Sequence, residues 1–154
     1  TSSSGTAATS DPTTAPTSTN ELADGSGCTP GSDTTLPDGR WYGLVDDADT
    51  AELDFDLACF FTGDAAIAAA AEDGEESPPP NDYHTRNARD LVRTFAVADE
   101  APVTWYPDGG DPANVVTVAY DQWLTDRPNR GFDLAVWLTI SSGTVIEIEE
   151  QWVP

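Results

Sequence analysis

The residues with the clearest chemical potential lie in one polar segment, 81–87, and in the arginines that follow it. Three of the six arginines and the single histidine fall within ten residues, from His84 to Arg93, in a chain whose formal net charge is -22. A guanidinium binds a carboxylate through paired hydrogen bonds, and an aromatic ring offers a face for stacking. We therefore interpret this region as a ligand-recognition site for a carboxylate, sugar or peptide, formed by Asn81, Asp82, Tyr83, Arg86, Asn87 and Arg93.

The same arginines have a structural alternative, which the acidic background favours. They can pair with neighbouring Asp and Glu and so hold a long loop in place. General acid–base chemistry by His84 with Asp82 would also need a nucleophile, yet no Ser or Cys lies in a context such as G-x-S-x-G. We therefore expect a protein without enzymatic activity and rank a hydrolase third among its functions.

A second group of residues, Asp46, Asp47 and Asp49, offers carboxylates to a hard cation such as Ca²⁺. The spacing does not match an EF-hand, because Ala51 stands at the next ligand position and the required Gly is absent. Asp and Glu number 28 in 154 residues, so such clusters arise by chance. Solvated acidic surface is the main interpretation, no cofactor is expected, and Ca²⁺ is the alternative.

The charge itself restricts the partners. The chain has 28 acidic residues, six arginines and no lysine, so it repels the phosphates of nucleic acids and anionic lipid surfaces. A protein or a glycan is the partner that the composition leaves open. The acid excess also fits a salt-adapted proteome, in which it would serve solvation.

The two cysteines, Cys28 and Cys59, predict a disulfide bond. The alternative is a buried thiol at Cys59 and a solvent-facing thiol at Cys28. The rest of the composition is typical of an extracytoplasmic protein, where an exposed free thiol is a liability, so we favour the bond. In the chain-entropy model a bridge that closes a loop of about 30 residues stabilises the fold by about 3 to 4 kcal/mol.

The chain divides into two parts. Residues 1–35 are rich in Thr, Ser, Ala, Pro and Gly, and contain Leu22 as their only large aliphatic residue, which predicts a disordered tether. Residues 36–154 contain all the aromatic side chains and predict one folded domain. N-terminal segments of similar composition follow the lipidated cysteine of many bacterial lipoproteins. The protein is therefore expected to be secreted or held at the cell surface by an N-terminal lipid anchor, and this anchor is the only membrane attachment that we expect.

The folded part is expected to be mainly β. Strands are predicted at 39–46, 52–61, 91–97, 102–106, 115–118, 133–140 and 144–152. The last two strands are predicted to form a hairpin that turns at 141–143. The side chains predicted to face inward in this hairpin are Leu134, Val136, Leu138, Ile140, Ile146, Ile148 and Trp152. Short helices are predicted at 65–72, capped by Asp64 and stopped by Gly74, and at 120–127. These elements favour a small, curved antiparallel β-barrel, OB-like or SH3-like, with two short inserted helices, and a two-layer α+β domain is the alternative.

Seven aromatic residues lie in or beside these strands: Trp41, Tyr42, Trp105, Tyr106, Trp123, Trp137 and Trp152. Some must point outward, as Trp137 does between Val136 and Leu138. Exposed, they could stack on a glycan or anchor a protein. The favoured alternative is that they cover the end of a barrel or pack under a helix.

Four stretches carry a resemblance: Leu-Pro-Asp-Gly-Arg-Trp-Tyr-Gly (36–43), Phe-Asp-Leu-Ala-Cys-Phe-Phe-Thr-Gly-Asp-Ala-Ala (55–66), Pro-Pro-Pro-Asn-Asp-Tyr (78–83) and Arg-Asn (86–87). With them, the chain from Leu36 onward resembles a family of uncharacterised secreted or lipid-anchored proteins of high-GC Gram-positive bacteria. The resemblance implies extracytoplasmic residence and a disulfide-tied barrel, and no activity. His84 departs from the family pattern, in which a second aromatic residue is usual.

These observations favour a non-enzymatic, extracytoplasmic binding module at the cell envelope. A Ca²⁺-dependent structural protein, or one that self-assembles through edge strands, is the alternative.

Overall fold

The computed structural model describes residues 28, 34–87 and 91–154. Of the predicted tether, only Cys28, Thr34 and Thr35 are among the described residues, so the prediction for the rest lies outside them. Arg89 also lies outside the described residues.

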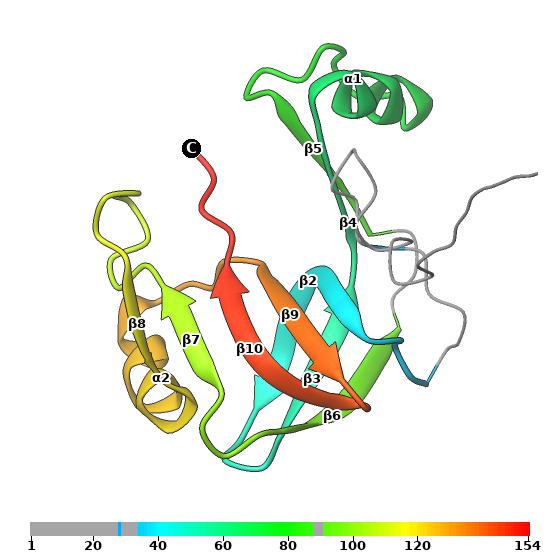
Figure 1. Ribbon diagram of the computed structural model, residues 1–154. Helices are drawn as coiled ribbons and strands as arrows, with labels where there is room; N and C mark the ends of the chain where they lie inside the picture. Colours follow the sequence, from blue (N-terminus) through cyan, green and yellow to red (C-terminus); the bar gives the residue numbers. More distant parts are fainter. Residues whose placement is uncertain (1–27, 29–33, 88–90) are drawn as a thin grey trace, which may run out of the picture.

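The main sheet has seven strands in the spatial order β6-β3-β2-β9-β10-β7-β8, and β10 pairs with β6 as well. This extra pairing joins five of the strands, β6, β3, β2, β9 and β10, into a ring (Figure 1). The bounds are β2 Gly39–Ala48, β3 Glu52–Leu57, β6 Val92–Val97, β7 Pro102–Trp105, β8 Val116–Ala119, β9 Val136–Ser141 and β10 Thr144–Glu150.

The mainly β fold with two short helices is confirmed, and the OB-like or SH3-like type stays a prediction. Two pairings differ from the expected antiparallel order: β10 runs parallel to β6 and to β7. The consecutive strands β6 and β7 both pair with the same edge of β10, with Thr144 opposite Ala96 and Ile148 opposite Val103. Alternation along a strand predicts which side chains are buried but not which strand lies beside it.

The β9–β10 hairpin turns at Ser142 and Gly143, which both have positive φ, as the turn prediction requires. Within β10 the register shifts between Val145 and Glu147, so the alternation is interrupted. Val145 is therefore buried, and the prediction that Ile146 faces inward is wrong, because its side chain is 42% exposed.

The predicted strand 52–61 divides at Ala58, whose N–H donates a hydrogen bond to the carbonyl oxygen of Tyr42. Its first part is β3, and its second part, β4 (Cys59–Thr62), leaves the ring and pairs with β5 (Tyr83–Arg86). Helix α1 (Gly63–Glu72) connects this pair with the loop before β5. We call residues 59–86 the arm, which projects from the ring in Figure 1.

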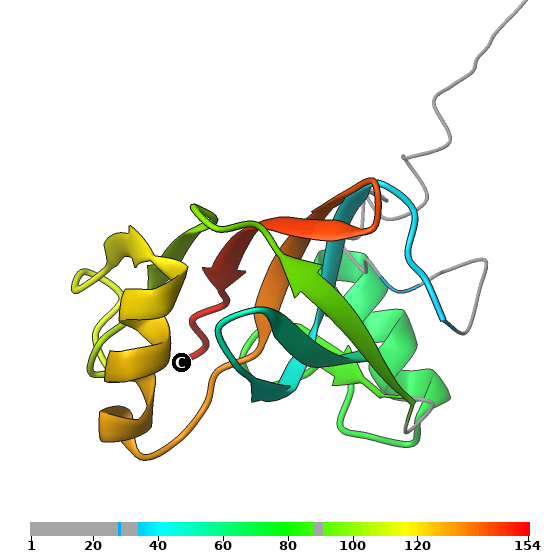
Figure 2. The ribbon, with the colours of Figure 1, turned by 90° about the horizontal axis from the view of Figure 1, so that it is seen from below.

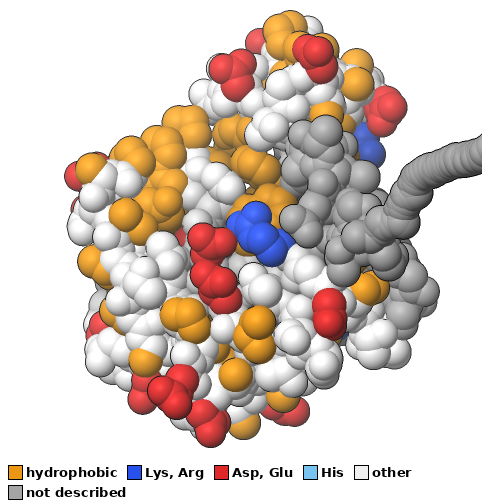
Figure 3. Space-filling view, in the orientation of Figure 1, with side chains coloured by type: hydrophobic (Ala, Val, Ile, Leu, Met, Phe, Trp, Pro, Cys, Tyr) orange, Lys and Arg blue, Asp and Glu red, His pale blue; other side chains and the backbone are white. Residues whose placement is uncertain are grey.

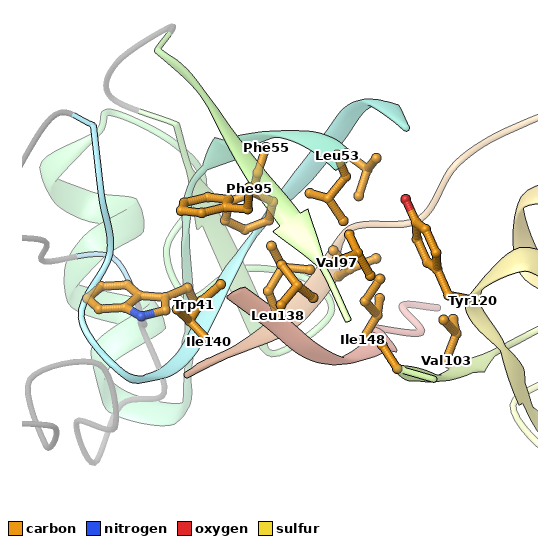
Figure 4. Packing of buried hydrophobic residues seen from close by; sticks show 14 of the residues in the cluster. Trp41, Leu53, Phe55, Phe95, Val97, Val103, Tyr120, Leu138, Ile140 and Ile148 are labelled. Atoms are coloured by element: carbon orange, nitrogen blue, oxygen red, sulfur yellow. The ribbon is translucent and has the colours of Figure 1, made fainter. Parts of the chain in front are cut away.

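The core fills the ring and continues beneath the second helix. Figure 4 shows Phe55, Phe95 and Leu138 in the middle of this cluster, with Trp41 at one end and Tyr120 at the α2 end. A smaller buried cluster, separate from this core, consists of Tyr42, Ala58, Phe60 and Trp137. Tyr83 packs against the smaller cluster, so the arm is fixed to the ring by aromatic contacts.

Both helices lie close to their predicted positions. Helix α1 ends before Gly74, whose φ of 74° suits a glycine, as predicted. Asp64 lies in its first turn but makes no capping hydrogen bond, and Thr62 occupies the N-cap, so the predicted cap is wrong. Helix α2 (Tyr120–Asp126) continues as the 3-10 helix η2 (Arg127–Arg130) through Pro128. Figure 2 shows α1 and α2 at opposite ends of the molecule.

Among the described helices, none combines the length and apolar character that crossing a membrane requires.

Candidate functional site

The arm presents β5 with two different faces. On one face Tyr83 stacks on Phe60, with ring centroids 5.6 Å apart. On the other, His84 stacks on Phe61 at 6.5 Å, and the Arg86 guanidinium lies 5.2 Å from the same Phe61 ring. Because side chains alternate along a strand, neighbouring residues of β5 separate into a face toward the smaller aromatic cluster and a face toward α1.

On the α1 face an ion-pair network joins β5 to the end of the helix. Arg86 Nε donates to both Asp73 carboxylate oxygens, at 2.9 and 3.1 Å, and Arg86 Nη2 donates to Glu72 at 3.0 Å. His84 Nε2 lies 2.7 Å from Asp73 Oδ2. Internal carboxylates thus engage the Arg86 guanidinium, which is the contact that the structural alternative predicts.

This network shifts the pKa values of Asp73 and Arg86. The hydrogen bonds from Arg86, and then the one shared with His84, hold the pKa of Asp73 below its usual range. In return, Asp73 and then Glu72 raise the pKa of Arg86. Asp73 is therefore the charged centre that couples β5 to α1.

A hollow runs along β5 beside the loop that leads into it. One part, of about 290 Å³, is lined by Glu75, Glu76, Pro79, Pro80, Asn81, Tyr83, His84 and Thr85. The adjoining part, of about 560 Å³, is lined by Asp73, Glu75, His84, Thr85, Arg86 and Asn87. The two parts share Glu75, His84 and Thr85, so they form one continuous depression, which we call the β5 hollow.

The structure brings four of the six predicted site residues to the β5 hollow: Asn81, Tyr83, Arg86 and Asn87. Asp82 lies beside it in an exposed turn with φ of 62° and does not line it. Arg93 belongs to β6, where alternation places it on the same face as Phe95, and it is only 4% exposed. Its guanidinium is therefore not available to a ligand at the hollow.

Sequence reasoning missed Glu75 and Glu76, which line the β5 hollow from the loop after α1. Their position in the sequence could have identified them, because these two adjacent carboxylates precede a proline block that leads the chain into the polar segment 81–87. Both are exposed, and neither carboxylate forms a hydrogen bond or ion pair within residues 28, 34–87 and 91–154. In the described part of the chain, Glu75 and Glu76 are the charges of the hollow that have no internal partner.

The predicted cation ligands do not converge. Asp46 falls at the register shift between Val45 and Asp47, and Asp47 accepts a hydrogen bond from the N–H of Ala48. Asp49 accepts from the backbone N–H groups of Ala51 and Glu52, which lower its pKa. In the described ranges, no group of three or more His, Cys, Asp or Glu has a metal-binding arrangement.

Most of the predicted aromatic surface is packed. Trp41, Trp105, Trp123 and Trp137 are each at most 8% exposed. Trp137 does point away from the core, but Arg40 covers its ring at 4.7 Å and its Nε1 donates to Gln151. The favoured alternative, packing, thus describes these four. On the face in Figure 3, hydrophobic side chains gather near the C-terminal end and the arm, and basic ones are few.

The arm is also held covalently, because the predicted disulfide between Cys28 and Cys59 is present, with a Cα–Cα distance of 4.8 Å. It joins the segment before the ring to the first residue of β4. A structural disulfide is typical of an oxidising, extracytoplasmic environment.

The fold and the site thus define a mainly β protein with a disulfide-tied arm. Comparison with protein-family models, with curated proteins and with solved structures found no match for this chain. The resemblance to secreted or lipid-anchored proteins of high-GC Gram-positive bacteria stays a prediction.

Proposed function

We propose that this protein is a non-enzymatic binding module that works outside the cytoplasm, at the cell envelope, and that it holds a protein or glycan ligand in the β5 hollow. The observation that carries the proposal is the meeting of four predicted site residues in one depression beside an edge strand. The disulfide supports the compartment. Secretion and lipid anchoring are both compatible with it.

The rigidity of the site supports binding. Arg86, His84 and Asp73 join β5 to α1, and Asn87 Nδ2 donates to Asp56 Oδ2 of β3 at 2.8 Å. A surface held in this way loses little conformational entropy when a ligand docks, so more of the contact energy remains as affinity. In this proposal the arginine that composition singles out organises the site and does not contact the ligand.

The experiment is to record amide chemical shifts of the disulfide-bonded chain while adding three ligand classes: extended peptides, neutral oligosaccharides and small carboxylates. We expect one class to shift amides within residues 75–87. Asn81→Ala should weaken that binding. Asn129→Ala changes another exposed asparagine, on η2 at the other end of the molecule, and should not weaken it. Shifts confined to other surfaces, or none with any class, would refute the proposal.

A second candidate, self-assembly through an edge strand, is favoured by the outer edge of β8. This strand ends the main sheet, and Val115, just before it, and Val116, its first residue, are 42% and 40% exposed. Open apolar edges are templates for pairing with another chain. Sedimentation in Ca²⁺ and in chelator would reveal oligomers, and Val116→Lys should abolish them if β8 is the contact. A monomer under both conditions would rule this candidate out.

A further inference from the structure

We propose that the ligand of the β5 hollow is an extended cationic peptide segment, which adds to the outer edge of β5 as a third strand and places Lys or Arg side chains against Glu75 and Glu76. This inference rests on the proposed function and specifies the ligand class.

In the described part of the chain, the outer edge of β5 is open. The arm sheet has two strands, β4 and β5. Among the residues that the structure describes, no segment other than β4 hydrogen-bonds to the backbone of Tyr83–Arg86. In an antiparallel pair alternate residues turn both their N–H and C=O groups away from the partner strand. An extended peptide can therefore satisfy these groups by strand addition.

The free charges of the hollow are negative in the described part of the chain. The guanidinium of Arg86 is engaged by Asp73 and Glu72, and the His84 ring is engaged by Asp73. Glu75 and Glu76 are the exposed charges that line the same hollow without an internal partner in the described part of the chain. The site therefore complements a cation, which reverses the expectation that an arginine here recognises a carboxylate.

The overall charge disfavours an acidic ligand or a second copy of this chain in the hollow. The net charge of -22 attracts a cationic segment over long range and repels both a carboxylate ligand and a second copy of this chain. Pro79, Pro80 and Tyr83 line the hollow beside the carboxylates, so it also has apolar walls. Side chains of a strand alternate between two faces, which suits a segment that alternates basic and apolar residues.

The experiment uses the full disulfide-bonded chain and a peptide of about eight residues that alternates Lys and Val, a length typical of a strand. We expect amide shifts at Tyr83–Arg86 and at Glu75 and Glu76. Two further peptides carry N-methyl groups on all valines or on all lysines. Strand addition requires the N–H groups of one set only, so one methylated peptide should bind at least about tenfold more weakly and the other should keep its affinity.

Paired charge variants test the carboxylates. Glu75→Gln with Glu76→Gln should weaken binding several-fold. Asp99→Asn with Glu100→Gln removes the same charge from exposed residues in the β6–β7 turn and should leave the affinity within about twofold. Equal losses in both double variants, or equal binding by both methylated peptides, would overturn the inference in favour of general charge attraction. A glycan or acidic peptide that shifts the same amides would overturn it and leave the proposed function intact.

Discussion

Arg130 and Glu150 form an ion pair in which each side chain is only 1% exposed, with contacts of 2.6 Å between Nη1 and Oε1 and 2.8 Å between Nη2 and Oε2. Glu150 Oε1 also accepts a hydrogen bond from the Tyr106 N–H, and Arg130 donates to the Tyr106 carbonyl. The pair thus fastens η2 to the end of β10 and to the chain after β7.

Glu150→Gln should destabilise the protein by about 3 to 5 kcal/mol, because it leaves a buried guanidinium without its counter-charge. The neighbouring Glu149 provides a matched control, since its pair with Arg40 is exposed, with side chains 40% and 43% accessible. Glu149→Gln should change the free energy of unfolding by less than about 1 kcal/mol. Denaturant unfolding of both variants measures the difference, and similar losses would show that burial does not govern the Arg130–Glu150 pair.

The sequence predicts local elements of this fold well. Alternation identified the buried positions Val136, Leu138 and Ile140 of β9, and a Ser-Gly turn marked the end of its hairpin. The division of the predicted strand 52–61 at Ala58 could not be read in this way, because Cys59 and the aromatic residues after it continue an apolar pattern. What divides the strand is the second sheet, a tertiary contact.

The candidate site shows the same limit. Composition selected the segment 81–87 as a candidate recognition site, and the structure places Asn81, Tyr83, Arg86 and Asn87 of it in one surface depression. Composition could not tell that Arg86 is held by Asp73, that Arg93 is buried in β6, or that Glu75 faces the same hollow. These facts depend on which segments the fold brings together.

Loss of the disulfide should destabilise the fold by about 3 to 4 kcal/mol, the value expected when a covalent link closes a loop of this size. The link spans a sequence separation of 31 residues. We expect Cys28→Ala with Cys59→Ala to lower the midpoint of thermal unfolding and to increase hydrogen exchange first in β4 and β5. Exchange that rises equally in β9 would indicate that the bond supports the ring instead of the arm.

The docking of α1 on β5 should weaken in acid. Arg86 and His84 lower the pKa of Asp73 in the folded state, so its ionised form contributes stability above the unfolded carboxyl pKa of about 3.9. That contribution is lost as the pH falls through the lower folded value. Asp73→Asn should therefore expose β5 amides to exchange at neutral pH and flatten the acid dependence. Asp99→Asn, in the exposed β6–β7 turn, should leave both unchanged.

Two strands of the ring contain at least one repulsive contact between like charges, and salt should weaken this repulsion. Asp47 of β2 lies directly opposite Asp54 of β3, and like charges in such a pair destabilise a sheet by about 0.2 to 1 kcal/mol. Asp47→Asn should therefore raise stability at low ionic strength, and the gain should shrink in 1 M NaCl, where the Debye length is about 3 Å. Asp46→Asn is the control, because this exposed neighbour has no partner in the β2–β3 register and should give a smaller gain. Equal stabilisation by the two variants, measured by denaturant unfolding at both salt concentrations, would mean that the overall charge of -22, and not the facing pair, sets the penalty.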